Sequence, residues 1–342
     1  MMHIVAVGLD HKGSSLPVRE KLAVPQHKIN MELQNLLHCP HIREALVLST
    51  CNRFELYVCT AQAPMALPKM MSFFHSLQPE RSSPVDPEYT LLDEKAVFHL
   101  FRVASGLESL IPGETQILSQ LKNAYAQAVE NQTIGPALSR LFQLALHCGK
   151  RVRHETEISK GAMSTGAAAV QLVGRRLGSW KNKKVLVIGA GKAGQMCVKT
   201  LLGLKQKPDI TVLNQSLENI KQVAFLDPSN SLTLSTSFEE CHQLAAEVDA
   251  VFVTTASANP VIKKHDFEFL GSWPEFIVDL SVPRNVEPLV AELDGLTLFT
   301  LDELKSTVDL NVARRATLLG HVEGIINDVV SNKWMKRYAS AG

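Results

Sequence analysis

Cys51 is the residue of this sequence best suited to nucleophilic chemistry. It lies in the run Ser-Thr-Cys-Asn-Arg at 49–53, directly after the apolar run EALVLS. A side chain at the end of a buried strand commonly emerges into a cleft, and the nearby guanidinium of Arg53 is expected to lower the pKa of the thiol toward neutrality. From local chemistry alone a structural cysteine is the more common interpretation, because most strand-end cysteines serve packing.

A glycine-rich turn is the second chemical feature. Gly189-Ala190-Gly191-Lys192-Ala193-Gly194 follows the apolar strand VLVIG and opens a helix. In that context the glycines allow a tight turn and a close approach to a pyrophosphate, which binds at the amides of the helix N-terminus. A second strand follows about twenty residues later, as in dinucleotide-binding units. The sequence therefore predicts dinucleotide binding rather than a turn that serves only helix–strand packing.

The end of that second strand bears on the choice of cofactor. Selectivity for NAD usually needs an Asp or Glu there, which accepts hydrogen bonds from the ribose 2′-hydroxyl. This chain has Asn214-Gln215-Ser216 instead. The missing carboxylate argues against NAD and leaves room for a 2′-phosphate, although no Arg stands there to bind it. Lys192 or Lys221 could supply the charge, but such lysines are more often simply solvated.

Further polar residues gather in a segment with helical periodicity. His99 lies within EKAVFHLFRVASGLESL, where a core or surface histidine is the more common interpretation. A polar turn follows and opens the helix ILSQLKNAY; its first residues could simply complement the helix dipole. As a set, these side chains could bind the amino and carboxylate groups of a small amino acid. The set consists of Ser109, Glu114, Thr115, Gln116 and Gln120.

Hydrophobic periodicity predicts an α/β protein with two domains and a long terminal helix. Residues 1–160 combine a small α/β sandwich with a helical second half, and form the predicted catalytic domain. Residues 161–301 alternate apolar strands with helices, which predicts a doubly wound, Rossmann-type nucleotide-binding domain. Residues 302–342 have a single helical period, and a helix of that length implies packing along another element or another chain.

Composition excludes several classes of protein. Lys and Arg number 35 against 34 Asp and Glu, so any contact with nucleic acid must be local. The six cysteines have neither the CxxC spacing nor the Cys/His spacing of a zinc site, and they indicate no disulfide framework. No apolar run is long enough for a membrane span, and the N-terminus lacks the pattern of a signal peptide. A cytoplasmic protein without membrane association is expected.

Taken together, the motifs resemble those of the glutamyl-tRNA reductase family. The resemblance rests on the 49–53 run, HLFRVASGLESLIPGETQILSQLKNAY at 99–125, GKRVRHET at 149–156, GAGKAG at 189–194 and DLSVPRNVEP at 279–288. GLDHKGSSLPVRE at 8–20 and NVARR at 311–315 match as well. The motifs follow the family's order over nearly the whole chain, and the first two are highly specific.

The resemblance implies a function in porphyrin biosynthesis. Glutamyl-tRNA(Glu) would be reduced by NADPH to glutamate-1-semialdehyde with release of tRNA, the first committed step toward 5-aminolevulinate and tetrapyrroles. In the family, the cysteine that matches Cys51 attacks the aminoacyl ester and holds glutamate as a thioester, which hydride from NADPH then reduces. His99 matches a residue important for activity, and Arg53 is suited to stabilise the thiolate and the developing oxyanion. No catalytic metal is implied.

The resemblance also implies two sets of binding residues. Those expected around the substrate are Thr50, Cys51, Asn52, Arg53, Ser109, Glu114, Thr115, Gln116 and Gln120. Those expected at the cofactor are Gly189, Ala190, Gly191, Lys192, Ala193, Gly194, Asn214 and Ser216.

Three departures from the family pattern limit the transfer. The family typically has Asn-Arg-Thr where this chain has Asn214-Gln215-Ser216, so the preference for NADPH over NADH is expected to be reduced. Ser281 replaces an expected Ala, a neutral change. The sequence ends at Gly342, so the separate dimerisation domain is expected to be missing or shortened and a homodimer to be weakened. The downstream aminomutase is a further expected partner.

Two other functions compete with this interpretation. A redox-inactive NADP-binding regulatory or adaptor protein could keep the fold, but the joint presence of Cys51, Arg53 and His99 argues against it. A reductase similar to shikimate dehydrogenase, acting on a free small molecule, would share the Rossmann half and would not need a strand-end cysteine. A requirement for charged tRNA in NADPH oxidation distinguishes these alternatives.

Overall fold

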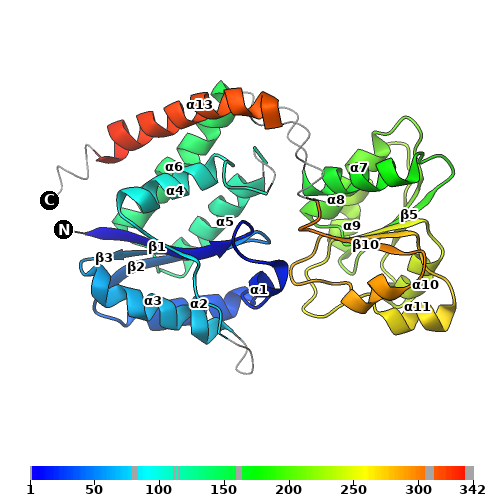
Figure 1. Ribbon diagram of the computed structural model, residues 1–342, viewed down its shortest axis with the longest axis horizontal. Coiled ribbons are helices and arrows are strands. Elements are labelled where there is room, and N and C mark those ends of the chain that lie inside the picture. The colour runs from blue at the N-terminus through cyan, green and yellow to red at the C-terminus, as the bar shows by residue number, and fades with distance from the viewer. Residues whose placement is uncertain are drawn as a thin grey trace. The chain divides into compact units, whose positions relative to one another are not determined.

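The computed structural model describes residues 2–78, 84–110, 113–114, 116–156, 158, 164–304 and 312–335, without the side chains of 312–317 and 335. The chain divides into two compact units (Figure 1). One consists of Met1–Ala162 together with Asn311–Gly342, and the other of Met163–Leu310. Among the described residues, no helix combines the length and apolar character needed to cross a membrane.

The first unit is built on an antiparallel four-stranded sheet in the order β2-β3-β1-β4. Its strands are β1 (His3–Asp10), β2 (Ile42–Ser49), β3 (Arg53–Thr60) and β4 (Tyr89–Leu92). Because side chains alternate between the faces of a strand, β3 sends Phe54, Leu56 and Val58 into one apolar core, and Tyr57 and Cys59 into the other. Both faces of the sheet are therefore covered.

Helices cover these two faces (Figure 1). Two helices lie between β1 and β2 in the chain, the short α1 (Leu16–Glu20) and α2 (Gln26–Leu37), and α3 (Ala63–Leu77) follows β3. The helices α2 and α3 contribute to the apolar core on one side of the sheet. On the other side lie α4 (Glu94–Ala104), α5 (Gln116–Glu130) and α6 (Pro136–Glu155). This arrangement confirms the predicted α/β class with a helical second half.

The helix closest to the C-terminus among the described residues packs on the first unit. α13 (Val312–Val329) continues into a π-helical end, η4 (Val330–Met335). Val322, Ile325, Ile326 and Val329 are buried in the same apolar core as α4 and α6. The partner that its apolar face requires is therefore supplied by the chain itself.

The second unit is a parallel six-stranded sheet in the order β10-β9-β8-β5-β6-β7. Its strands are β5 (Lys184–Ile188), β6 (Asp209–Leu213), β7 (Thr233–Ser235), β8 (Ala250–Val253), β9 (Phe276–Asp279) and β10 (Thr297–Thr300). The order reverses at β5, which is the switch point of a doubly wound fold. The Rossmann prediction is confirmed. The sequence missed β7, a half-exposed strand of three residues with too little periodicity to detect.

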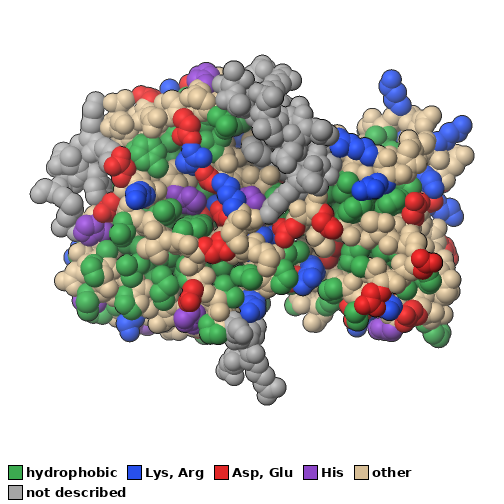
Figure 2. All heavy atoms as spheres, viewed as in Figure 1, with side chains coloured by type: hydrophobic (Ala, Val, Ile, Leu, Met, Phe, Trp, Pro, Cys, Tyr) green, Lys and Arg blue, Asp and Glu red, His purple; other side chains and the backbone are tan. Residues whose placement is uncertain are grey.

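Helices flank this sheet on both faces (Figure 1). They are α7 (Thr165–Leu177), α8 (Lys192–Leu202), α9 (Leu217–Ala224), α10 (Cys241–Ala246) and α11 (Lys264–Leu270), with 3₁₀ turns η1 (Phe238–Glu240) and η2 (Pro288–Glu292). Lys and Arg side chains gather over α7 and α8, whereas Asp and Glu side chains gather over the α10 and α11 side (Figure 2).

Candidate active site

The turn between β2 and β3 holds Cys51 in a fixed backbone conformation. The Thr50 hydroxyl oxygen accepts hydrogen bonds from the amides of Asn52 and Arg53, both at 3.1 Å, and the Thr50 amide donates to the Arg53 carbonyl at 2.9 Å. A threonine hydroxyl commonly replaces a backbone acceptor in this way. The His11 amide donates to the Asn52 carbonyl at 2.9 Å, which ties the turn to the end of β1.

The surroundings of Cys51 disfavour its thiolate. Burial, and to a lesser extent Glu114, raise the pKa of the thiol to about 12, although Arg19 and Arg53 act in the opposite direction. The expectation that Arg53 brings this pKa toward neutrality is wrong. Desolvation outweighs the cation, and the guanidinium of Arg53 is already paired with a carboxylate.

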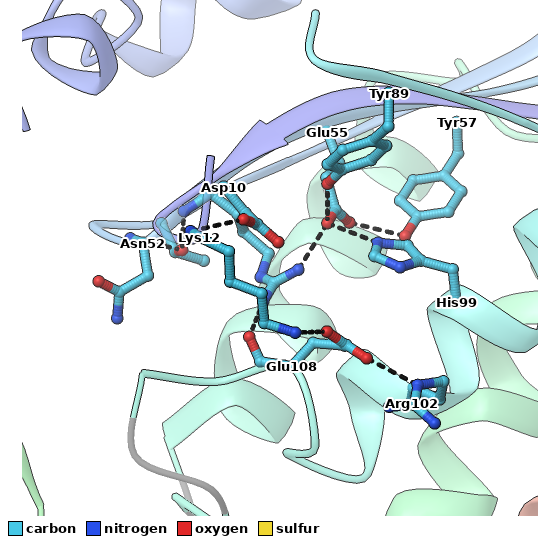
Figure 3. A network of polar contacts seen from close by, with 11 residues as sticks. Asp10, Lys12, Asn52, Glu55, Tyr57, Tyr89, His99, Arg102 and Glu108 are labelled. Carbon is cyan, nitrogen blue, oxygen red and sulfur yellow. Dashed lines mark hydrogen bonds and ion pairs between the residues drawn. The ribbon is translucent and has the colours of Figure 1, made fainter. Parts of the chain in front are cut away.

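That carboxylate belongs to Glu55, the centre of a buried polar network (Figure 3). Arg53 Nη1 donates to Glu55 Oε1 at 2.6 Å, and His99 Nε2 lies 2.9 Å from the same oxygen. The hydroxyls of Tyr57 and Tyr89 donate to Glu55 at 2.6 and 2.7 Å. Burial raises the pKa of Glu55, but Arg53 and His99 outweigh it and hold the pKa well below its usual range. The carboxylate is therefore kept ionised in the core.

A second carboxylate, Glu108, anchors the loop that follows α4 (Figure 3). Arg53 Nη2 donates to the Glu108 carbonyl, so one guanidinium joins the β2–β3 turn to this loop. The Glu108 carboxylate accepts hydrogen bonds from Lys12 Nζ and, at 2.6 Å, from Arg102 Nε. Burial raises the pKa of Glu108, but Lys12 and Arg102 lower it to about 2. Arg102 also pairs with Glu323, which connects the network to α13.

The structure brings several predicted residues together. Arg53 and His99 meet at Glu55, although they are far apart in the sequence. Glu114 is buried and acts on the pKa of Cys51. Asn52 is buried, and its side-chain oxygen Oδ1 has no hydrogen-bond partner among the described residues. An acceptor in that state is suited to an ammonium or hydroxyl donor of a ligand.

Other predicted residues are placed less directly. Ser109 is buried beside Glu108, in the loop that Arg53 holds. Gln116 and Gln120 lie in the first two turns of α5, and within the described contacts no hydrogen bond joins either to the Cys51 turn. Thr115 lies outside the described residues.

The sequence analysis missed the carboxylates and tyrosines of the network. A signal for Glu55 was present: in the strand RFELYVCT an arginine, a glutamate and a tyrosine occupy alternate positions, and alternate positions share a face. An acidic side chain on a face that is otherwise buried requires a partner such as Arg53. No comparable local signal marks Glu108 or Lys12, because loop packing brings them together.

The glycine turn of the second unit fits a dinucleotide. Gly189 has φ of +102°, a conformation that L side chains rarely adopt. A Cβ at Gly194 would lie 2.0 Å from the Gly189 carbonyl oxygen, so only glycine allows the helix to approach this closely. A Cβ at Gly191 would meet no atom of the described residues within 4 Å. Gly191 therefore borders open space at the N-terminus of α8, where a pyrophosphate binds in this fold.

Asn214 ties this turn to the end of β6. Its Oδ1 accepts from the Ala190 amide and its Nδ2 donates to the Ser216 carbonyl, both at 3.0 Å. The Ser216 hydroxyl caps α9 by accepting from the Asn219 amide at 3.4 Å. Gln215, Ser216 and Lys192 are exposed and Ala193 is half-buried. Among the described residues, no group of three His, Cys, Asp or Glu side chains is arranged to hold a metal ion.

A thiol-bearing α/β unit joined to a dinucleotide-binding unit defines a nicotinamide-dependent oxidoreductase. Residues 7–156 match the family described as glutamyl-tRNAGlu reductase, N-terminal domain, and residues 171–307 match shikimate / quinate 5-dehydrogenase. The glutamyl-tRNA reductase of Thermosynechococcus vestitus is 38% identical over 330 residues, covering 96% of this chain and 77% of that protein. That of Synechococcus sp. (strain JA-3-3Ab) is 38% identical over 334 residues, covering 96% and 76%.

The chain belongs to the glutamyl-tRNA reductase family. Among solved structures, the glutamyl-tRNA reductase from Methanopyrus kandleri is similar, with 30% identity, a TM-score of 0.49, and coverage of 96% of this chain and 78% of that one. The match to shikimate / quinate dehydrogenases is limited to the Rossmann half.

Proposed function

We propose that this chain reduces the glutamyl group of glutamyl-tRNA with NADPH, giving glutamate-1-semialdehyde and free tRNA. The observation that supports this most is the half-buried Cys51, held in a rigid turn in the unit that matches the glutamyl-tRNA reductase N-terminal family. Glu114 and the open acceptor of Asn52 lie in the same region and are suited to bind the amino group of a glutamyl residue.

Cys51 would act as the nucleophile toward the aminoacyl ester. Its Sγ forms a bond to the glutamyl carbonyl carbon, the ester C–O bond breaks, and the thiol proton ends on the released tRNA hydroxyl. Because burial raises the pKa of Cys51 to about 12, the proton must leave as the new bond forms. Sulfur donates less electron density to the carbonyl than oxygen, so the thioester is the better hydride acceptor.

The glycine turn would hold the pyrophosphate of NADPH at Gly189, Gly191 and Gly194. When bound, NADPH supplies the hydride. The 2′-phosphate is assigned to the region of Asn214 and Ser216, because no carboxylate there would repel it. Gln215→Arg should improve the kcat/KM for NADPH and leave that for NADH nearly unchanged. Equal gains with both cofactors would place the 2′-phosphate elsewhere.

Two variants separate the thiol from the hydride. Without NADPH, the wild-type enzyme should still deacylate glutamyl-tRNA slowly, because water hydrolyses the thioester. Cys51→Ser should lose both deacylation and reduction, since a hydroxyl is a far weaker nucleophile at neutral pH. Gly191→Val should lose reduction alone, because its side chain would occupy the space above the turn.

The result that contradicts the proposal is a folded Cys51→Ser enzyme that makes glutamate-1-semialdehyde at the wild-type rate. NADPH oxidation with a free small acid and no tRNA would favour the reductase similar to shikimate dehydrogenase. NADPH binding without any oxidation would favour the adaptor protein.

A homodimer and an association with the downstream aminomutase remain predictions. Sedimentation velocity at micromolar protein concentration, with and without the aminomutase, tests both of them.

A further inference from the structure

Positive charge is concentrated in one stretch of this chain. Residues 158–208 contain ten Lys and Arg and no Asp or Glu, although the whole chain has a net charge of only +1. Residues 222–262 show the opposite pattern, with five Asp and Glu and no Lys or Arg. Both stretches lie mainly in the second unit. This unit is therefore strongly polarised.

The fold gathers the positive stretch at one edge of the sheet. α7 ends at Leu177 before β5 begins at Lys184, and α8 ends at Leu202 before β6 begins at Asp209. Because β5 and β6 are parallel neighbours, both connections lie at their amino-terminal edge. The connections touch: the Ser179 hydroxyl donates to Gln206 Oε1 at 3.0 Å.

Seven exposed cations lie at this edge, and we call them the α7–α8 basic face. They are Arg175, Arg176, Lys181, Lys184, Lys199, Lys205 and Lys207. Within the part of the chain that the structure describes, none of the seven side chains forms an ion pair. Lys183 is excluded from the face because its ammonium pairs with Asp249 at 2.7 Å. Figure 2 shows the same contrast between the α7–α8 side and the α10–α11 side.

Helix stability explains only part of the basic face. Arg175, Arg176 and Lys199 lie near helix C-termini, where cations interact favourably with the helix dipole. Lys181, Lys205 and Lys207 lie outside the helices, where this effect does not apply. Like charges in proximity repel one another, so the arrangement favours a polyanionic ligand.

The cofactor does not account for this face. The glycine turn follows β5 and therefore lies at the carboxyl-terminal edge of the sheet, opposite the basic face. A face of several exposed cations suits a row of phosphates. Among biological polyanions, the tRNA of the proposed substrate supplies such a row.

We propose that the α7–α8 basic face binds the phosphate backbone of the tRNA in glutamyl-tRNA; this rests on the proposed function. Contacts of Lys and Arg with phosphates release counterions, so they make binding dependent on salt and carry no sequence information. The second unit thereby contributes to substrate affinity as well as to cofactor binding. The face positions substrate and takes no part in the chemistry at Cys51.

The test combines four substitutions, Arg175→Gln, Arg176→Gln, Lys205→Gln and Lys207→Gln, in the full chain. We expect the KM for glutamyl-tRNA to rise about tenfold, and the slope of log Kd against log salt to become shallower by about 3. Filter binding of labelled tRNA measures the slope. The kcat and the Kd for NADPH should match the wild-type values, which shows that the unit is folded.

Two controls isolate the charge. Lys205→Arg with Lys207→Arg keeps both cations and should keep the wild-type KM and slope. Lys263→Gln removes one exposed cation that lies outside the basic face, directly after the acidic stretch 222–262, and should also leave the KM and slope unchanged.

The inference is overturned if the fourfold variant has the wild-type KM and salt slope while the wild-type enzyme reduces glutamyl-tRNA. It is also overturned if the substitutions abolish binding to phosphatidylglycerol vesicles and leave tRNA binding intact, because the face would then bind a membrane surface. A wild-type enzyme that fails to reduce glutamyl-tRNA under all conditions refutes the proposed function instead.

Discussion

Arg53 donates a hydrogen bond to Glu55 across 2.6 Å, and the two side chains are only 1% and 0% exposed. The two residues occupy alternate positions of β3, so both point to the same face of the sheet. Glu55 also accepts hydrogen bonds from Tyr57 and Tyr89 and contacts His99. Arg53 is thus a fixed structural cation, and its charge is largely balanced before any substrate arrives.

Removing the negative partner of this pair should destabilise the protein. Glu55→Gln leaves the Arg53 charge buried and uncompensated, so we expect the free energy of unfolding to fall by about 3–5 kcal/mol. Urea denaturation followed by circular dichroism measures it. Tyr89→Phe removes one hydrogen bond to the same carboxylate and should cost only about 1–3 kcal/mol. A Glu55→Gln protein as stable as Tyr89→Phe would contradict the central role of this pair.

The thiol of Cys51 should alkylate slowly at neutral pH. Because burial raises its pKa to about 12, the thiolate is scarce in the ligand-free protein. The rate of iodoacetamide modification at Cys51, followed by peptide mass spectrometry, should still be rising at pH 10. A small-molecule thiol under the same conditions should approach its plateau near about pH 9–10. A plateau for Cys51 below pH 8 would show an activated thiolate instead.

Lowering the pH should reduce the stability of the first unit, because Glu108 becomes protonated. Burial raises the pKa of this carboxyl, but Lys12 and Arg102 lower it to about 2 from its usual 4.5. A lowered pKa in the folded state stabilises the protein above about pH 4.5, and this contribution is lost as pH falls toward 2. Glu108→Gln should therefore lose less stability than the wild type between about pH 5 and pH 3. Parallel stability–pH curves would rule out this contribution.

Two glycines of the cofactor turn should differ in their tolerance of a methyl group. A Cβ at Gly194 would lie 2.0 Å from the Gly189 carbonyl oxygen, so Gly194→Ala must displace α8 and should lower the melting temperature. Gly191→Ala meets no described atom within 4 Å and should change stability by about 0.5 kcal/mol or less. Differential scanning calorimetry compares them. Equal melting temperatures would contradict the close approach of α8 to the Gly189 carbonyl.

Local patterns in the sequence determined the fold class, five of the six Rossmann strands and the place of Cys51 at the end of a strand. Apolar periodicity and glycine spacing are properties of neighbouring residues, so the β5 turn and the β2–β3 turn follow from short segments. The alternation of Arg53, Glu55 and Tyr57 along one strand is equally local, although the sequence analysis did not use it.

Tertiary structure alone decided the electrostatics of the site and the partner of the last helix. His99 and Tyr89 contact Glu55, and Glu108 contacts Arg53, from elements that are distant in the sequence from β3. In the same way α13 packs on α4 and α6, which lie far earlier in the chain. The direction of the Cys51 pKa shift depends on how much water the surrounding elements exclude and on which charges they bring near. Desolvation and charge pairing are properties of neighbours in space, so a residue's position in the sequence cannot establish them.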